Sequence, residues 1–253
     1  MKKFLLIISA ISTLLMLPRA VYAMHITEGI LPPQWAILWF LVAAPFVAIG
    51  TYKIKKRRRV IPGYMPLIGM IGAAVFVFSC FPIPVIALNG MATAHPAGTG
   101  MSAIFLGPFV SVPVAGIALL IQALFLAHGG LTTLGGNIFS MGILGSFSGY
   151  FAFWSAKKLR LSPFWWGFFA GIISDIFTYL GTSIELGLLV VDKGDSFFKA
   201  AGEIFAAFMM TTQGPLCVME GVVVGFVVSY VYKHRPAILA ELGVMEGRAS
   251  VQT

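Results

Sequence analysis

The sequence predicts an all-α, polytopic helical membrane protein. Hydrophobic residues make up 58% of its 253 residues and charged residues only 10%, whereas about 25% of the residues in soluble domains are charged. A soluble protein of this composition would expose large apolar patches. Three short basic segments each follow an apolar run, at residues 53–59, 157–160 and 233–235. Because short cytoplasmic loops are enriched in Lys and Arg, the net charge of +8 indicates orientation and contact with anionic lipid, not nucleic-acid binding.

The first 23 residues have the features of a cleavable signal peptide. Lys2 and Lys3 precede an apolar core at residues 4–17, and residues 21–23 form a small-residue cleavage site. This core has fewer residues than a membrane-spanning helix, which needs about 20. The alternative is an uncleaved signal anchor. We expect a leader at 1–23, a metal-binding transmembrane domain at 24–232 and a cytoplasmic tail at 233–253.

The apolar runs and the basic segments together predict the topology. Six runs are evident, at residues 35–52, 64–88, 101–127, 137–156, 163–191 and 205–232. If segments 53–59 and 157–160 both face the cytoplasm, an even number of crossings must separate them, yet only three runs lie between. The segment 82–113, rich in Pro and Gly, is the candidate for a broken helix, which is tolerated only inside protein or beside a cavity. This predicts about seven transmembrane helices, with the amino terminus outside and the carboxyl terminus inside.

Three pairs of glycines recur at a spacing of four residues. They predict helix faces that allow close approach, either within the bundle or against a partner membrane protein. The pairs are Gly145 and Gly149, Gly167 and Gly171, and Gly221 and Gly225.

Cleavage after Ala23 would create a nitrogen chelate at the new amino terminus. The amine of Met24, the amide nitrogen of His25 and the His25 imidazole can surround one ion. A planar nitrogen set suits Ni(II) or Cu(II) and also accepts Co(II). The missing ligand should be an imidazole, either His95 or His128, since both lie in glycine-rich segments.

Other polar residues near these histidines are candidates for supporting roles. A ligating histidine needs a hydrogen-bond partner that selects its tautomer. The alternative for each internal histidine is a purely structural role. Glu28 would pair with the new amino terminus or line the entrance. The candidates for the supporting partner are Thr99, Thr132, Thr133 and Asn137.

Carboxylates inside apolar runs are costly and therefore mark candidate functional sites. Asp175 and Glu220 lie deep in their runs, and Glu185 and Glu203 lie nearer the expected outer ends. The alternative is a hydrogen-bonded interior carboxylate with a structural role.

Three segments resemble the CbiM/NikM family, the substrate-specificity subunits of energy-coupling-factor transporters for cobalt and nickel. These segments are residues 24–32, 95–100 and 128–137, and the resemblance extends from Met24 to about residue 232. It implies that the ligands are the amine of Met24, the amide and imidazole nitrogens of His25 and the imidazole of His95, with His128 in support. Gly136 stands where an alanine is common in the family, and the leader resembles cobalt members more than nickel members.

The resemblance also implies a transport function without enzymatic activity. The sequence contains no phosphate-binding loop, and the family implies a transmembrane coupling subunit, two ATPase subunits and a small accessory membrane subunit. The expected role is capture of Co(II) as a transported substrate, with no resident cofactor, and its delivery across the plasma membrane for cobalamin biosynthesis. The alternatives are the same role for Ni(II), a membrane metalloenzyme, and a structural or sensing protein.

Overall fold

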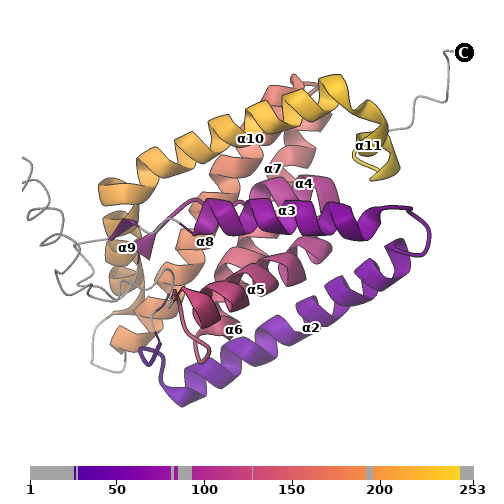
Figure 1. The fold of residues 1–253 in the computed structure, drawn as a ribbon. Coiled ribbons are helices and arrows are strands. Elements are labelled where there is room, and N and C mark those ends of the chain that lie inside the picture. The colour runs from indigo at the N-terminus through magenta and orange to yellow at the C-terminus, as the bar shows by residue number, and fades with distance from the viewer. Residues whose placement is uncertain are drawn as a thin grey trace, which may run out of the picture.

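The computed structural model describes residues 26, 28–80, 83–84, 93–126, 128–191 and 196–245. These residues form a helical bundle with one very short hairpin (Figure 1). The all-α class is therefore confirmed. The expected leader, Met24 and His25 lie outside the described residues, so the cleavage and the first ligands stay predictions.

The helices follow one another with short connections. Strands β1 and β2 pair antiparallel, with Ile83 opposite Ala94. The elements are α2 (Pro33–Arg57), α3 (Tyr64–Ser79), β1 (Ile83–Pro84), β2 (Thr93–Ala94), α4 (Thr99–Leu106), α5 (Pro108–Phe125), α6 (Leu134–Asn137), the π-helix η2 (Ile138–Gly145), α7 (Ser146–Lys158), α8 (Pro163–Val191), α9 (Phe197–Phe208), the π-helix η3 (Met209–Gln213), α10 (Gly214–His234) and α11 (Pro236–Glu241).

Among the described residues, 4 helical segments are long and apolar enough to cross a membrane. The fourth joins α9, η3 and α10 into one continuous segment, Phe197–His234, and α3 is a shorter apolar helix. The count of about seven membrane helices stays a prediction.

The predicted break in the segment 82–113 is observed at Gly107. There α4 ends and α5 begins, with Gly107 at φ 84° and Pro108 as the first residue of α5. Glycine reaches this backbone conformation without strain. The expected run 101–127 is therefore two helices, and all eight residues of α4 are buried. The expected run 64–88 is also shorter, because α3 ends at Ser79 and prolines at 82 and 84 cannot continue a helix.

The paired glycines lie at helix contacts inside the bundle. A Cβ atom added to Gly149 would lie 2.9 Å from the Cα of Gly100, so α7 and α4 approach closely. A Cβ added to Gly171 would lie 3.0 Å from the Cα of Gly221, at the contact between α8 and α10. This supports the packing interpretation of these faces.

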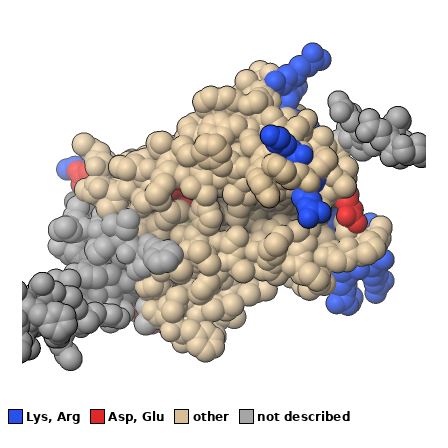
Figure 2. Space-filling model, turned by 45° about the horizontal axis from the view of Figure 1, so that its top comes forward, with Lys and Arg blue, Asp and Glu red and all other residues tan. Residues whose placement is uncertain are grey.

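The three basic segments meet at one end of the bundle. The guanidinium of Arg57 donates to the carbonyl of Leu106 at 2.8 Å, and the ammonium of Lys157 donates to the carbonyl of Val244 at 2.7 Å. Figure 2 shows Lys and Arg side chains gathered at that end. This is the arrangement expected if all three segments lie on the same side of a membrane.

Candidate metal centre

The loop that carries His95 connects β2 to α4 and is held by two other helices. The backbone N–H of His95 donates to the Tyr179 hydroxyl oxygen at 2.7 Å, and this hydroxyl donates to the His95 carbonyl at 2.9 Å. The side-chain amide of Gln213 donates to the same carbonyl at 3.3 Å. Since Tyr179 lies on α8 and Gln213 on η3, two separate helical segments hold the His95 backbone in place.

The His95 ring is fully buried and its tautomer is set locally. Nδ1 lies 2.8 Å from the carbonyl oxygen of Pro96. A carbonyl only accepts, so Nδ1 carries the proton and the lone pair lies on Nε2, as in a typical ligating histidine. Burial lowers the pKa of His95 to about 4, the hydrogen bond with Pro96 opposes this shift, and the charge of His128 adds to it. The imidazole is therefore neutral near pH 7, as ligation requires.

Glu220 holds the two residues that follow Pro96. Its carboxylate accepts from the N–H of Ala97 at 2.6 Å and from the N–H of Gly98 at 2.8 Å. Nearby, Asp175 accepts a hydrogen bond from Gln213. Both interior carboxylates thus support the His95 loop, which matches the structural alternative for them.

A second set of contacts fixes the start of the described chain. Ile26 is fully buried; its N–H donates to the Asn137 side-chain oxygen at 3.2 Å, and its carbonyl accepts from the Thr133 hydroxyl at 2.8 Å. Asn137 also donates to the Thr133 hydroxyl at 3.4 Å. Ile26, the first described residue, is therefore fixed to the turn at Thr133 and Asn137.

Glu28 ties the same segment to the residues before α6. Its carboxylate accepts from the N–H of Thr132 at 3.2 Å and from the Thr132 hydroxyl. Gly130 permits this approach, because a Cβ there would lie 2.7 Å from the Cα of Glu28. In the described part of the chain, Glu28 therefore anchors the segment to this loop.

The contacts of the His95 loop and the contacts of Ile26 lie next to each other in the bundle. Ile26 packs in one hydrophobic cluster with Ala94, which precedes His95, and with Tyr179. His128 is half-buried, and its charge is the smallest of the three causes that act on the pKa of His95. Nδ1 of His128 is buried without a hydrogen-bond partner in the described chain.

The expected supporting residues divide into two groups. Thr132, Thr133 and Asn137 all contact the segment that follows His25. The Thr99 hydroxyl instead lies 3.0 Å from the Ser174 hydroxyl and joins α4 to α8. The Pro96 carbonyl takes the role of selecting the His95 tautomer.

Tyr179 and Gln213 contact the His95 backbone although the sequence did not mark either as a site residue. The one available signal was that Tyr179 lies one helical turn after Asp175 in an apolar run.

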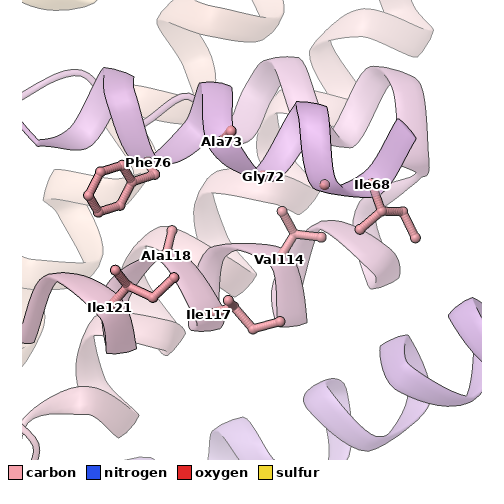
Figure 3. Close-up of a pocket in the computed structure, with 9 residues that line it drawn as sticks. Ile68, Gly72, Ala73, Phe76, Val114, Ile117, Ala118 and Ile121 are labelled. Carbon is pink, nitrogen blue, oxygen red and sulfur yellow. The ribbon is translucent and has the colours of Figure 1, made fainter. Parts of the chain in front are cut away.

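Within the described residues, no group of three or more His, Cys, Asp and Glu side chains could hold a metal ion. The groove between α3 and α5, about 390 Å³ in volume, is apolar and offers no ligating side chain (Figure 3). Its lining residues are Ile68, Gly69, Gly72, Ala73, Phe76, Val114, Ile117, Ala118 and Ile121. A metal bound at His95 would therefore need donors from outside the described residues, where Met24 and His25 lie.

We expect Thr133→Val to weaken metal binding without unfolding the protein. Valine keeps the shape of threonine but removes the hydroxyl that donates to the Ile26 carbonyl, at a cost of about 1 kcal/mol. Loss of such a supporting contact typically lowers metal affinity about 10- to 100-fold. Titration of Co(II) into the purified variant would measure this. Thr211→Val is the control, because the exposed Thr211 hydroxyl donates to the Ala207 carbonyl within its own helical segment. Equal affinities in the two variants would contradict the expectation.

The chain is similar in sequence to proteins of cobalt uptake. A family model described as the cobalt uptake substrate-specific transmembrane region matches residues 25–238. A cobalt transport protein CbiM from Geobacter sulfurreducens is 45% identical over 238 residues, covering 94% of this chain and 68% of the relative. One from Sorangium cellulosum is 43% identical over 222 residues, covering 88% of this chain and 97% of the relative.

Solved structures share the fold as well. A crystal structure of a transition metal transporter has a TM-score of 0.73 and 28% identity, covering 83% of this chain and 93% of its own. A truncated transition metal transporter has a TM-score of 0.72 and 27% identity, covering 83% of this chain and 99% of its own.

Proposed function

The chain belongs to the CbiM family of cobalt-uptake transmembrane proteins, and we propose that it is the membrane subunit that binds Co(II) and passes it into the cell. It captures the ion with four nitrogens, namely the amine of Met24, the amide and imidazole nitrogens of His25, and the imidazole of His95.

One observation carries this proposal: the residue after His25 is fixed beside the His95 loop. Ile26 is held through both its N–H and its carbonyl, and it shares a hydrophobic cluster with Ala94. Ordering this residue has an entropic cost, which its two hydrogen bonds and the burial of its side chain offset.

The donor set accounts for the proposed selectivity. Four nitrogens in a plane favour late transition metals over Mg(II) and Ca(II), which prefer oxygen, and disfavour tetrahedral Zn(II). Capture takes place on the outer side of the plasma membrane. A transmembrane coupling subunit, two ATPase subunits and a small accessory subunit then drive release into the cytoplasm, where the ion supplies cobalamin biosynthesis.

The direct test combines the mature amino terminus with metal binding. Mass spectrometry of the purified chain should show Met24 as its first residue, and the chain should bind about one Co(II). His25→Ala should lose the ion. An added alanine before Met24 should be nearly as harmful, since it moves the amine out of the chelate ring. An intact leader, or full affinity in both variants, would overturn the proposal. Parallel titration with Ni(II) distinguishes the two cargoes.

Co(II) affinity should fall as the pH is lowered from 8 to 6. The ordinary pKa of a terminal amine is about 8 and that of histidine about 6.5, and both groups and the amide must lose protons to bind the metal. We expect affinity at least about a hundredfold weaker at pH 6, since each released proton contributes about tenfold per pH unit. His95 adds nothing in this range, because burial lowers its pKa to about 4. Titrations at pH 6, 7 and 8 would show this, and a profile that fell only below pH 5 would contradict it.

A further inference from the structure

Glu185 is a fully buried carboxylate whose two oxygens have no hydrogen-bond partner in the described chain. It lies on α8, ten residues after Asp175 and six residues after Tyr179. The other two carboxylates buried in the described bundle differ, because Glu220 and Asp175 both accept hydrogen bonds. The support of the His95 loop therefore does not explain Glu185.

The surroundings of Glu185 place it against the turn that holds the amino-terminal segment. A Cβ atom added to Gly136 would lie 3.1 Å from one Glu185 oxygen and 3.4 Å from the other. Gly136 directly precedes Asn137, which binds the N–H of Ile26. The next residue on α8, Leu186, packs in the hydrophobic cluster that contains Ile26 and Ala94. Glu185 thus lies beside the turn that holds Ile26.

An ionised carboxylate in such a place is costly unless a cation compensates it. The described chain offers no cation for this purpose, since its one ion pair joins Lys199 and Glu203 on α9. A Co(II) ion bound to neutral amine and imidazole nitrogens and to one deprotonated amide would carry a net charge of +1. One nearby carboxylate would balance that charge.

We propose that Glu185 provides the negative charge that balances the metal–nitrogen complex. This inference rests on the proposed function. Glu185 is a positioning and charge-balancing residue, not a ligand, and the glycine at 136 leaves its carboxylate room beside the turn. The ligand class that it favours is a divalent transition-metal ion in a mixed amine, amide and imidazole site.

The test compares Glu185→Gln and Glu185→Asp with Glu203→Gln, which removes one charge from an exposed position on α9. Co(II) titration and thermal unfolding with and without Co(II) would be measured on each purified full-length variant. We expect Glu185→Gln to lower Co(II) affinity at least about tenfold and to shrink the stabilisation by metal. The melting temperature without metal should stay the same or rise, since the glutamine removes a buried group that lacks a partner. Glu185→Asp should retain part of the affinity.

The outcomes separate the two proposals. If the parent chain binds Co(II) and Glu185→Gln binds it equally well, the charge-balancing role is wrong while the transport proposal stands. If Glu185→Gln lowers the melting temperature without metal as much as with metal, the role is structural and the inference is also overturned. If the parent chain binds no Co(II), both proposals fail.

Discussion

Replacing His95 with alanine is expected to abolish Co(II) binding while the protein still folds. The substitution removes the buried imidazole that we propose as the fourth nitrogen ligand. Removing a group that hydrogen-bonds to a metal ligand typically lowers metal affinity about 10- to 100-fold. Removing a ligand itself should therefore lower Co(II) affinity by more than about a hundredfold. The backbone bonds from Tyr179 and Gln213 to residue 95 do not involve the ring and would persist.

Equilibrium titration of Co(II) into the purified His95→Ala variant measures this effect. His234→Ala is the matched control, because His234 is exposed and its ring lies against Tyr230 of the same helix, with Nδ1 3.0 Å from the Tyr230 carbonyl oxygen. His128→Ala should have an intermediate effect, since His128 is expected to support the site without being a proposed ligand. Full Co(II) affinity after removal of His95 would rule out its assignment as the fourth nitrogen.

Glu220→Ala is expected to destabilise the protein by about 4 kcal/mol and to weaken Co(II) binding as well. The change leaves the N–H groups of Ala97 and Gly98 buried without their acceptor, and each such group costs about 1–3 kcal/mol. The loop that follows His95 would then lose its attachment to α10. Binding should weaken because the ring is no longer held in place.

Thermal unfolding in detergent would report the loss of stability, and Glu203→Ala on the exposed face of α9 is the control for removing a carboxylate. The melting temperature of Glu220→Gln should lie between those of Glu220→Ala and Glu203→Ala. A glutamine keeps one acceptor oxygen but turns an N–H donor toward the second backbone N–H. A melting temperature equal to that of the parent would show that the loop does not depend on this carboxylate.

Features that depend on composition and local chain chemistry were predictable from the sequence. The membrane class follows from the low charge content, and the break between α4 and α5 follows from the density of proline and glycine. The grouping of residues 53–59, 157–160 and 233–235 at one end follows from the alternation of apolar runs with basic segments. Each of these signals lies within a short stretch of chain.

The contacts that build the site could not be predicted in the same way. Glu220 binds residues more than 120 positions earlier, and Asn137 binds Ile26 across 111 positions. Such pairings depend on the three-dimensional packing of helices, which hydropathy does not encode. The π-helical segments η2 and η3 were also not anticipated, although η3 carries Gln213, whose side-chain amide donates to the His95 carbonyl.

The attachment of the His95 loop to α8 and α10 has a consequence for how cargo leaves. These two helices pack through Gly167, Gly171, Gly221 and Gly225, so a motion that separated them would have to break close backbone contacts. The His95 half of the centre should therefore stay still during a transport cycle. If the proposed nitrogen set is correct, release of the ion would then require a change on the amino-terminal side of the centre, where two hydrogen bonds hold the backbone of Ile26 to the bundle.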